Sequence, residues 1–175
     1  PNLHQSIISD SHISYNRLGG IRIEKSAMFN LQITGNDIEY NNNRAHKVPD
    51  ADDIPTAEIY IDASDGLVKE GTICSNTIQA TYSTGGANIR IIGGPPDTPE
   101  GNRRAGLWSI SGNLIGSQTD NIHLTSVGGI TIAGNYIYNG LRRNLLIEDC
   151  RNVVVGDRKS TRLNSSHDQS SYAVV

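Results

Sequence analysis

Four side chains that bind carboxylates or transfer protons occupy the same position in four similar short segments of the sequence. Each lies between two aliphatic residues, and together they are Arg22, Tyr60, Arg90 and His123. Such a set fits β-elimination from a uronic acid, in which a cation neutralises the sugar carboxylate, a base removes a C–H proton and an acid protonates the leaving oxygen. We predict Arg22 or Arg90 as the neutralising cation and Tyr60 and His123 as the proton-transfer groups.

Carboxylates follow at the next position of the same face, at Glu24, Asp62 and Glu148. We predict that these three bind substrate. Carboxylate oxygens also suit Ca²⁺, so these acids could alternatively hold that ion, and no other cofactor is predicted. Two carboxylates roughly 5 Å or 6.5–9.5 Å apart would suit glycoside hydrolysis, and Glu24 and Asp62 are the candidates for the shorter distance. No metal-ligand spacing surrounds the histidines, so we predict no transition-metal site.

The segments that carry these residues alternate aliphatic with polar side chains, the period of a half-buried strand. Five copies occur, at 20–23, 58–61, 88–91, 121–124 and 144–147. If the five strands pair in register, their outward side chains form two columns. The first column reads Arg22, Tyr60, Arg90, His123 and Leu146, and the second reads Glu24, Asp62, Ile92, Thr125 and Glu148.

A second repeated motif, Ile-x-x-Asn-x-Ile, follows these strands. Its four clear copies lie at 31–38, 71–78, 108–115 and 130–137, and a degenerate copy lies at 8–13. In register the copies give stacks of aliphatic residues, and they place Trp108 beside Gly71, a size match typical of close packing. The asparagines fall at a bend, where stacked amides can hydrogen-bond to one another. We therefore predict a structural ladder of Asn36, Asn76, Asn113 and Asn135.

The pattern Gly-Ile-x-Ile, followed by Ile-x-x-Asn-x-Ile-x-x-Asn, resembles the right-handed parallel β-helix of the pectate-lyase-like superfamily over residues 6 to about 156. The resemblance implies an all-β, right-handed parallel β-helix (a solenoid) of about six coils, with three short strands per coil. It also implies a polysaccharide partner and an extracellular or cell-envelope location. It does not select an activity, because the superfamily includes lyases, glycosidases, epimerases, phage tailspikes and non-catalytic surface proteins.

A leucine-rich repeat is the competing fold, because residues 31–38 also match its Leu-x-Leu-x-x-Asn-x-Leu corner. Leucine-rich repeats keep a nearly constant period of about 20–29 residues. Here the intervals between the motif asparagines vary almost twofold, and no helix-forming segment fills the gaps. These differences favour the β-helix.

Composition excludes several classes of partner. The net charge is −3 and no run of Lys and Arg occurs, so we predict no nucleic-acid partner. No apolar run approaches the length of a membrane span, so no span is predicted. Nothing in the sequence indicates an oligomeric state.

The ends of the sequence suggest a fragment with an added tail. The chain begins close to a strand, and we expect its cap and any signal peptide upstream. From Asp157 the text Asp-Arg-Lys-Ser-Thr-Arg-Leu-Asn-Ser-Ser-His resembles the in-frame translation of a sequencing adapter, and Arg158 stands where the repeat predicts Asn. We therefore predict a β-helix domain fragment over 1–156 and a non-native, disordered tail over 157–175.

Two functional hypotheses stay open. The first is an enzyme, either a polysaccharide lyase or a glycoside hydrolase, with β-elimination favoured because the polygalacturonase motifs Asn-Thr-Asp, Gly-His-Gly and Arg-Ile-Lys are absent. The second is a non-catalytic extracellular binding or structural β-helix of the adhesin or tailspike kind. Insertions at 42–56 and 93–105 would border the candidate face. A cleft lined by the candidate residues favours the enzyme, whereas side chains paired flat against the surface favour binding.

Overall fold

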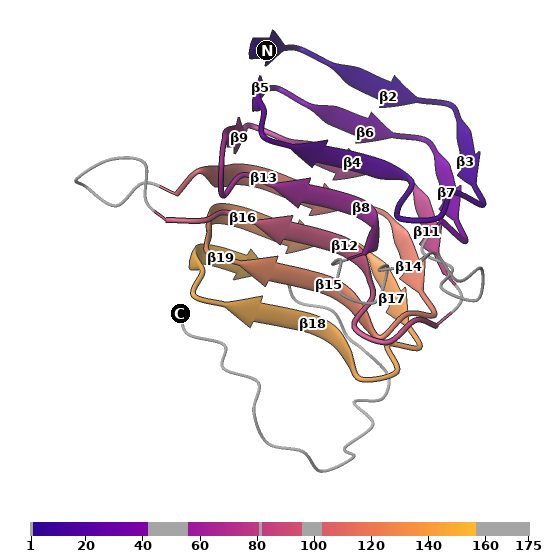
Figure 1. Cartoon of the computed structure of the whole chain (residues 1–175). Coiled ribbons are helices and arrows are strands. Elements are labelled where there is room, and N and C mark those ends of the chain that lie inside the picture. Colours follow the sequence, from indigo (N-terminus) through magenta and orange to yellow (C-terminus); the bar gives the residue numbers. More distant parts are fainter. Residues whose placement is uncertain (1, 42–55, 81, 96–102, 157–175) are drawn as a thin grey trace.

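The computed structural model describes residues 2–41, 56–80, 82–95 and 103–156, and within these residues the only regular elements are β-strands. The strands form three sheets in which every pairing is parallel. The arrangement is all-β and consistent with a parallel β-helix solenoid (Figure 1). The insertions at 42–56 and 93–105 lie largely outside the described residues, and so does the tail at 157–175.

The first sheet has five strands, and its central strands are six residues long. They are β4 (Ile21–Glu24), β8 (Ala57–Asp62), β12 (Ala87–Ile92), β15 (Asp120–Thr125) and β18 (Arg143–Glu148). These are the five strands expected from the alternating segments.

The second sheet contains nine of the described strands and the third contains five. The second comprises β1 (Asn2–His4), β2 (Ile7–Ser9), β5 (Ala27–Phe29), β6 (Gln32–Thr34), β9 (Leu67–Lys69), β10 (Thr72–Cys74), β13 (Ala105–Ser111), β16 (Val127–Ala133) and β19 (Arg151–Val155). The third comprises β3 (His12–Ser14), β7 (Asp37–Glu39), β11 (Thr77–Gln79), β14 (Leu114–Gly116) and β17 (Tyr136–Tyr138).

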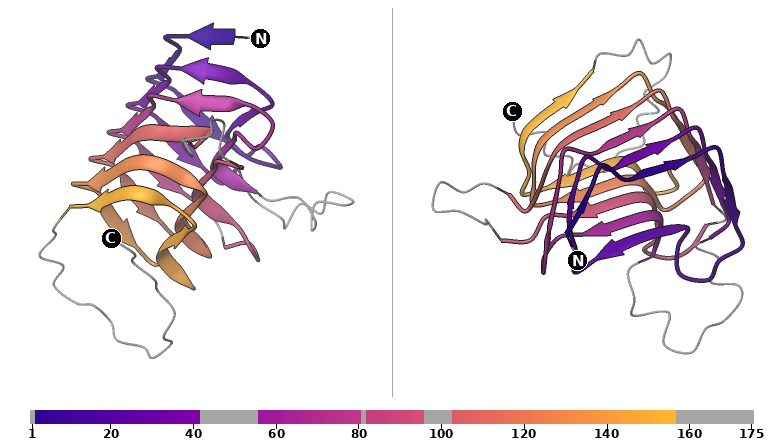
Figure 2. Two further views of the ribbon diagram at one scale, coloured as in Figure 1. Left: turned by 90° about the vertical axis from the view of Figure 1, so that its left-hand side faces the viewer. Right: turned by 90° about the horizontal axis from the view of Figure 1, so that it is seen from above.

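The chain visits the first, second and third sheets in that order and then returns to the first. Seen from above, it winds around one interior with the sheets as walls (Figure 2). Each strand therefore pairs with the strand one circuit away, so that residues far apart in sequence become neighbours in register.

The second sheet departs from the expected single strand per coil. In the early coils this segment forms two short strands, β5 with β6 and β9 with β10, separated at Asn30 and Glu70. Both residues adopt a left-handed backbone, with φ of 54° and 62°. Gly106 pairs with Lys69, so Leu107 is the equivalent of Glu70 in the next coil. Leu107 has a φ of 58° although it lies inside the continuous strand β13. The kink thus recurs at one register position, and a sequence pattern of apolar residues does not reveal it.

The interior is aliphatic, as the columns predicted. Ile38, Ile78 and Ile115 pair in register on the third sheet and are fully buried. Ile33, Ile73 and Ile110 do the same on the second sheet. Burying each such side chain contributes about 1.5–3 kcal/mol relative to leaving it in water.

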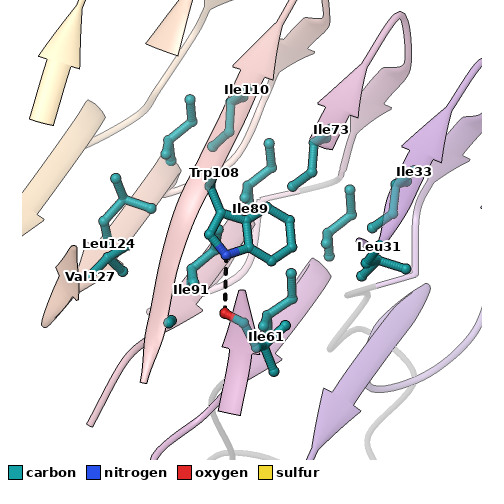
Figure 3. Packing of buried hydrophobic residues seen from close by; sticks show 14 of the residues in the cluster. Leu31, Ile33, Ile61, Ile73, Ile89, Ile91, Trp108, Ile110, Leu124 and Val127 are labelled. Atoms are coloured by element: carbon teal, nitrogen blue, oxygen red, sulfur yellow. Dashed lines mark hydrogen bonds between the residues drawn. The ribbon is translucent and has the colours of Figure 1, made fainter. Parts of the chain in front are cut away.

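Trp108 lies beside Gly71, as predicted. A Cβ added to Gly71 would stand 2.2 Å from Cζ3 of the indole, so only glycine leaves room for the ring. The indole Nε1 donates to the Val68 carbonyl at 3.4 Å, and the ring lies among Ile73, Ile89 and other core side chains (Figure 3). The polar tip of the one tryptophan is therefore satisfied inside an apolar core.

The predicted asparagine ladder is present at the bend between the second and third sheets. Asn36, Asn76 and Asn113 each donate from Nδ2 to Oδ1 of the next asparagine, at 3.0, 3.0 and 2.9 Å, and the last acceptor is Asn135. Each acceptor oxygen also receives the backbone N–H of the preceding ladder residue. The amides are buried, so the ladder satisfies backbone donors that water does not reach.

Candidate functional site

The outward face of the first sheet carries both predicted columns of side chains. The pairing of the five strands places Arg22, Tyr60, Arg90, His123 and Leu146 in one column, called here the Arg22 column. It places Glu24, Asp62, Ile92, Thr125 and Glu148 in a second, the Glu24 column. The predicted register is thus confirmed, whereas the catalytic and binding roles stay predictions.

The guanidinium of Arg22 contacts groups from three residues of the described chain, among its other interactions. Nη1 donates to the Leu18 carbonyl at 3.1 Å, and Nη2 donates to Oε1 of Glu24 at 2.8 Å. Its Cζ atom lies 4.2 Å from the centroid of the Tyr60 ring, a cation–π geometry. Arg22 is therefore oriented before any ligand arrives.

Tyr60 is almost fully buried, with 3% of its surface exposed. Its hydroxyl donates to Oδ2 of Asp62 at 3.1 Å, and the other Asp62 oxygen accepts the backbone N–H of Ser64 at 2.9 Å. Burial, together with the neighbouring Asp62 charge, raises the pKa of Tyr60 to about 12. The phenol keeps its proton at neutral pH, so it cannot serve there as the base of an elimination.

Arg90 also lies below the surface, with 7% exposed, and its Nη2 donates to the Gly85 carbonyl at 2.6 Å. The backbone of the same coil thus orients this cation. Arg90 nonetheless affects its neighbour, because its positive charge helps to lower the pKa of His123 in the next coil.

His123 forms the second polar pair of the face, with Glu148. Its Nε2 lies 2.7 Å from Oε2 of Glu148 and 3.3 Å from the Thr125 hydroxyl. Burial lowers the pKa of His123 and outweighs the hydrogen bond to Glu148, which acts in the opposite direction. The imidazole is therefore neutral near pH 7, and the short distance to a carboxylate assigns its proton to Nε2.

With the proton on Nε2, the basic lone pair of His123 is on Nδ1. Within the described part of the chain, Nδ1 is buried and has no hydrogen-bond partner. The nitrogen that could accept a proton is thus covered by neighbouring atoms, while Nε2 already donates to Glu148. This geometry opposes proton abstraction from a substrate on the face.

The three predicted acids do not converge on one point. Glu24 and Asp62 lie on adjacent strands, but Glu148 stands three strands beyond Asp62, roughly 14 Å away at ~4.8 Å per strand. The structure therefore does not bring them together as one calcium ligand set. Each instead bonds to a neighbour, Glu24 to Arg22, Asp62 to Tyr60 and Glu148 to His123.

A second amide ladder, which was not predicted from the sequence, lies at the start of the strands of the first sheet. Asn88 donates to Oδ1 of Asn121 at 2.8 Å, and Asn121 donates to Oδ1 of Asn144 at 2.8 Å. Glu58 occupies the equivalent position of β8 and is fully buried, accepting hydrogen bonds from the backbone and side chain of Asn41. Asn precedes the first aliphatic residue in three of the five strands, and this recurrence could have revealed the ladder. The ladder fixes the register of these strands beneath the candidate face.

Comparisons of the chain with protein-family models, with curated proteins and with solved structures give no match. Among the described residues, none belongs to a helix that is long and apolar enough to cross a membrane. The functional proposal therefore depends on the geometry of the face itself.

Proposed function

We propose that this chain is a stretch of right-handed parallel β-helix of about six coils, of the pectate-lyase-like kind, and that the outward face of its first sheet binds an acidic polysaccharide. The fixed order in which the chain visits the sheets supports the solenoid. Six strands of the second sheet in mutual register, β2, β6, β10, β13, β16 and β19, support the coil number. An extracellular or cell-envelope location belongs to the same proposal.

Arg22 carries the binding proposal. Its guanidinium is fixed by Tyr60 and by the Leu18 carbonyl, while Nη2 meets the carboxylate of Glu24. The Glu24 side chain is 43% exposed, and an ion pair this open to water contributes at most about 1 kcal/mol. A uronate carboxylate can replace Glu24 at little cost and keep the same charge-assisted hydrogen bond.

The two columns run along the stack of coils, a direction that suits an extended polymeric ligand. The outward residues repeat at the strand spacing of about 4.8 Å, across the strands and along the stack. A polysaccharide lying along the stack would cross Arg22 first and the His123–Glu148 pair three strands later. Both sites offer polar groups that stand on paired strands, so little ordering accompanies binding.

The geometry favours binding over elimination. Tyr60 is buried and keeps its proton, and the basic nitrogen of His123 is buried too. The acids that could act with them are bonded to these same groups. Side chains paired with one another in this way suit a binding or structural role better than catalysis.

Affinity electrophoresis through gels containing polygalacturonate, alginate or neutral dextran tests the proposal, with and without Ca²⁺. We expect the uronate polymers to retard the protein and dextran to leave it unretarded. The same mixtures are followed by ultraviolet absorbance for unsaturated uronate products, and no rise is expected. Failure of every uronate to retard the protein would reject the binding proposal, and a rise in absorbance would replace binding with β-elimination.

A further inference from the structure

A second cluster of ligand-bearing side chains lies on the outward face of the third sheet, away from the Arg22 column. His12 on β3 pairs in register with Asp37 on β7, and Glu39 follows two residues later on the same face of that strand. One ligand atom from each of the three residues lies within 4.8 Å of the other two. The cluster is assembled from adjacent coils, so spacing along the sequence does not reveal it.

The distances within this cluster are long for close hydrogen bonds and are near those between two ligands of one ion. His12 Nε2 lies 3.3 Å from Oε1 of Glu39 and 3.9 Å from Oδ2 of Asp37. Ordinary hydrogen bonds to nitrogen are about 2.7–3.2 Å long. Neighbouring ligands of a metal with bonds of about 2.0–2.2 Å are about 3.0–3.6 Å apart, and a small rotation of the exposed His12 brings Asp37 into that range.

Asp37 adds an independent observation. Its Oδ1 atom is buried and has no hydrogen-bond partner among the described residues, although the side chain as a whole is about half exposed. A buried carboxylate oxygen without a donor is unfavourable. The oxygen nearer to His12 is Oδ2 of the same carboxylate, so a cation bound by both oxygens would also give Oδ1 a positive partner.

Two successive hydrogen bonds orient Glu39 through its other carboxylate oxygen, Oε2. Gln79 donates from Nε2 to Oε2 of Glu39 at 2.7 Å, and Tyr138 donates from its hydroxyl to Oε1 of Gln79 at 3.2 Å. Tyr138 reaches Gln79 across Gly116, where a Cβ would stand 2.3 Å from the ring. The chain leaves the Oε1 atom of Glu39 turned toward His12, as outer partners of metal ligands commonly do.

We propose that His12, Asp37 and Glu39 bind one divalent transition-metal ion of the Zn²⁺ class, with water completing its coordination. The imidazole selects against Ca²⁺ and Mg²⁺, which prefer ligand sets made only of oxygen. The two carboxylates balance the charge of the ion. Gln79 is a positioning residue, because it acts on the ion only through Glu39.

Isothermal titration of the whole chain with ZnCl₂ at neutral pH tests the site, with His12→Gln as the variant and His4→Gln as its control. His4 is another exposed histidine near the same end, but it stacks on Phe29 of the second sheet. We expect one saturable equivalent of Zn²⁺, retained by His4→Gln and weakened at least tenfold by His12→Gln. Equal binding by both variants, or no saturable binding by the parent protein, would overturn the proposal.

Two further measurements keep the test decisive. Gln79→Ala leaves all three ligands in place and should weaken Zn²⁺ binding about tenfold, within the 10–100-fold usual for such partners. Co²⁺ should give weak visible bands typical of nitrogen and oxygen ligands. Intense near-ultraviolet bands would instead place the ion on a thiolate of Cys74 or Cys150 and reject the site.

Discussion

Replacing Asn113 by alanine tests the buried ladder at a residue that makes five side-chain hydrogen bonds, as Asn76 does. The Asn113 amide donates to the Ile73 carbonyl at 2.9 Å, to the Ser111 carbonyl at 3.2 Å and to Oδ1 of Asn135 at 2.9 Å. Its oxygen accepts both the backbone N–H and the side-chain amide of Asn76, each at 3.0 Å. Alanine removes all five contacts from a residue that is 2% exposed.

Most of the expected loss of stability comes from one buried hydrogen-bond donor that is left without an acceptor. The Asn76 side-chain amide keeps the Ile33 and Cys74 carbonyls, and the Asn135 oxygen keeps the backbone N–H of Asn113. The backbone N–H of Asn76 instead loses its acceptor inside the protein, at a cost of about 1–3 kcal/mol. With the smaller contribution of the other lost bonds, we expect Asn113→Ala to lower the free energy of unfolding by about 2–4 kcal/mol.

Urea denaturation followed by Trp108 fluorescence measures this change, because the chain has one tryptophan and it is buried in the core. Asn16→Ala is the matched control. Asn16 makes the same kind of amide contact, to Asn41 at 2.7 Å, but it is exposed and should lose less than about 1 kcal/mol. A loss for Asn113→Ala no larger than that for Asn16→Ala would refute the argument that the ladder satisfies buried donors.

Two further predictions concern the core and the candidate face. Gly71→Ala should destabilise the protein by about 1–3 kcal/mol through the clash with Trp108, and Trp108→Leu should relieve much of that loss in the double variant, as measured by circular dichroism during urea unfolding. Additive losses would show that the two residues do not touch. Since the folded pKa of His123 is lowered, the unfolded chain binds more protons just below the usual histidine pKa, and stability should fall there as the pH falls. His123→Gln should remove this part of the pH dependence, and an unchanged slope would contradict the role of burial.

Much of the architecture follows from the sequence because the repeats constrain one another. Once the copies around Asn36 and Asn76 are aligned, the alternation of each strand fixes which side chains point outward, and the observed pairing of Arg22 with Tyr60 follows. The asparagine ladder and the Trp108–Gly71 contact are predictable for the same reason, since each relates equivalent positions of neighbouring coils. Handedness rests on the resemblance and coil number also on the six strands in register, and both stay within the proposal.

The features that were not predicted depend on backbone conformation and burial, which an alignment of the sequence repeats does not report. The kinks at Asn30 and Glu70 arise from left-handed backbone at residues other than glycine, which apolar periodicity does not report. Burial of Tyr60 depends on neighbours from several elements, so an outward direction did not guarantee exposure. The His12 cluster could have been predicted from the sequence, because the register that aligns Ile13 with Ile38 also brings His12 beside Asp37.

Binding of a defined oligouronide by isothermal titration, compared between Arg22→Gln and Arg151→Gln, tests the central claim most directly. Both variants remove one positive charge, but Arg151 is exposed on β19 of the second sheet. Loss of a charge-assisted hydrogen bond should weaken binding about 10- to 100-fold in Arg22→Gln and change it less than about twofold in Arg151→Gln. Equal affinities in the two variants would contradict the assignment of the Arg22 face as the polysaccharide-binding surface.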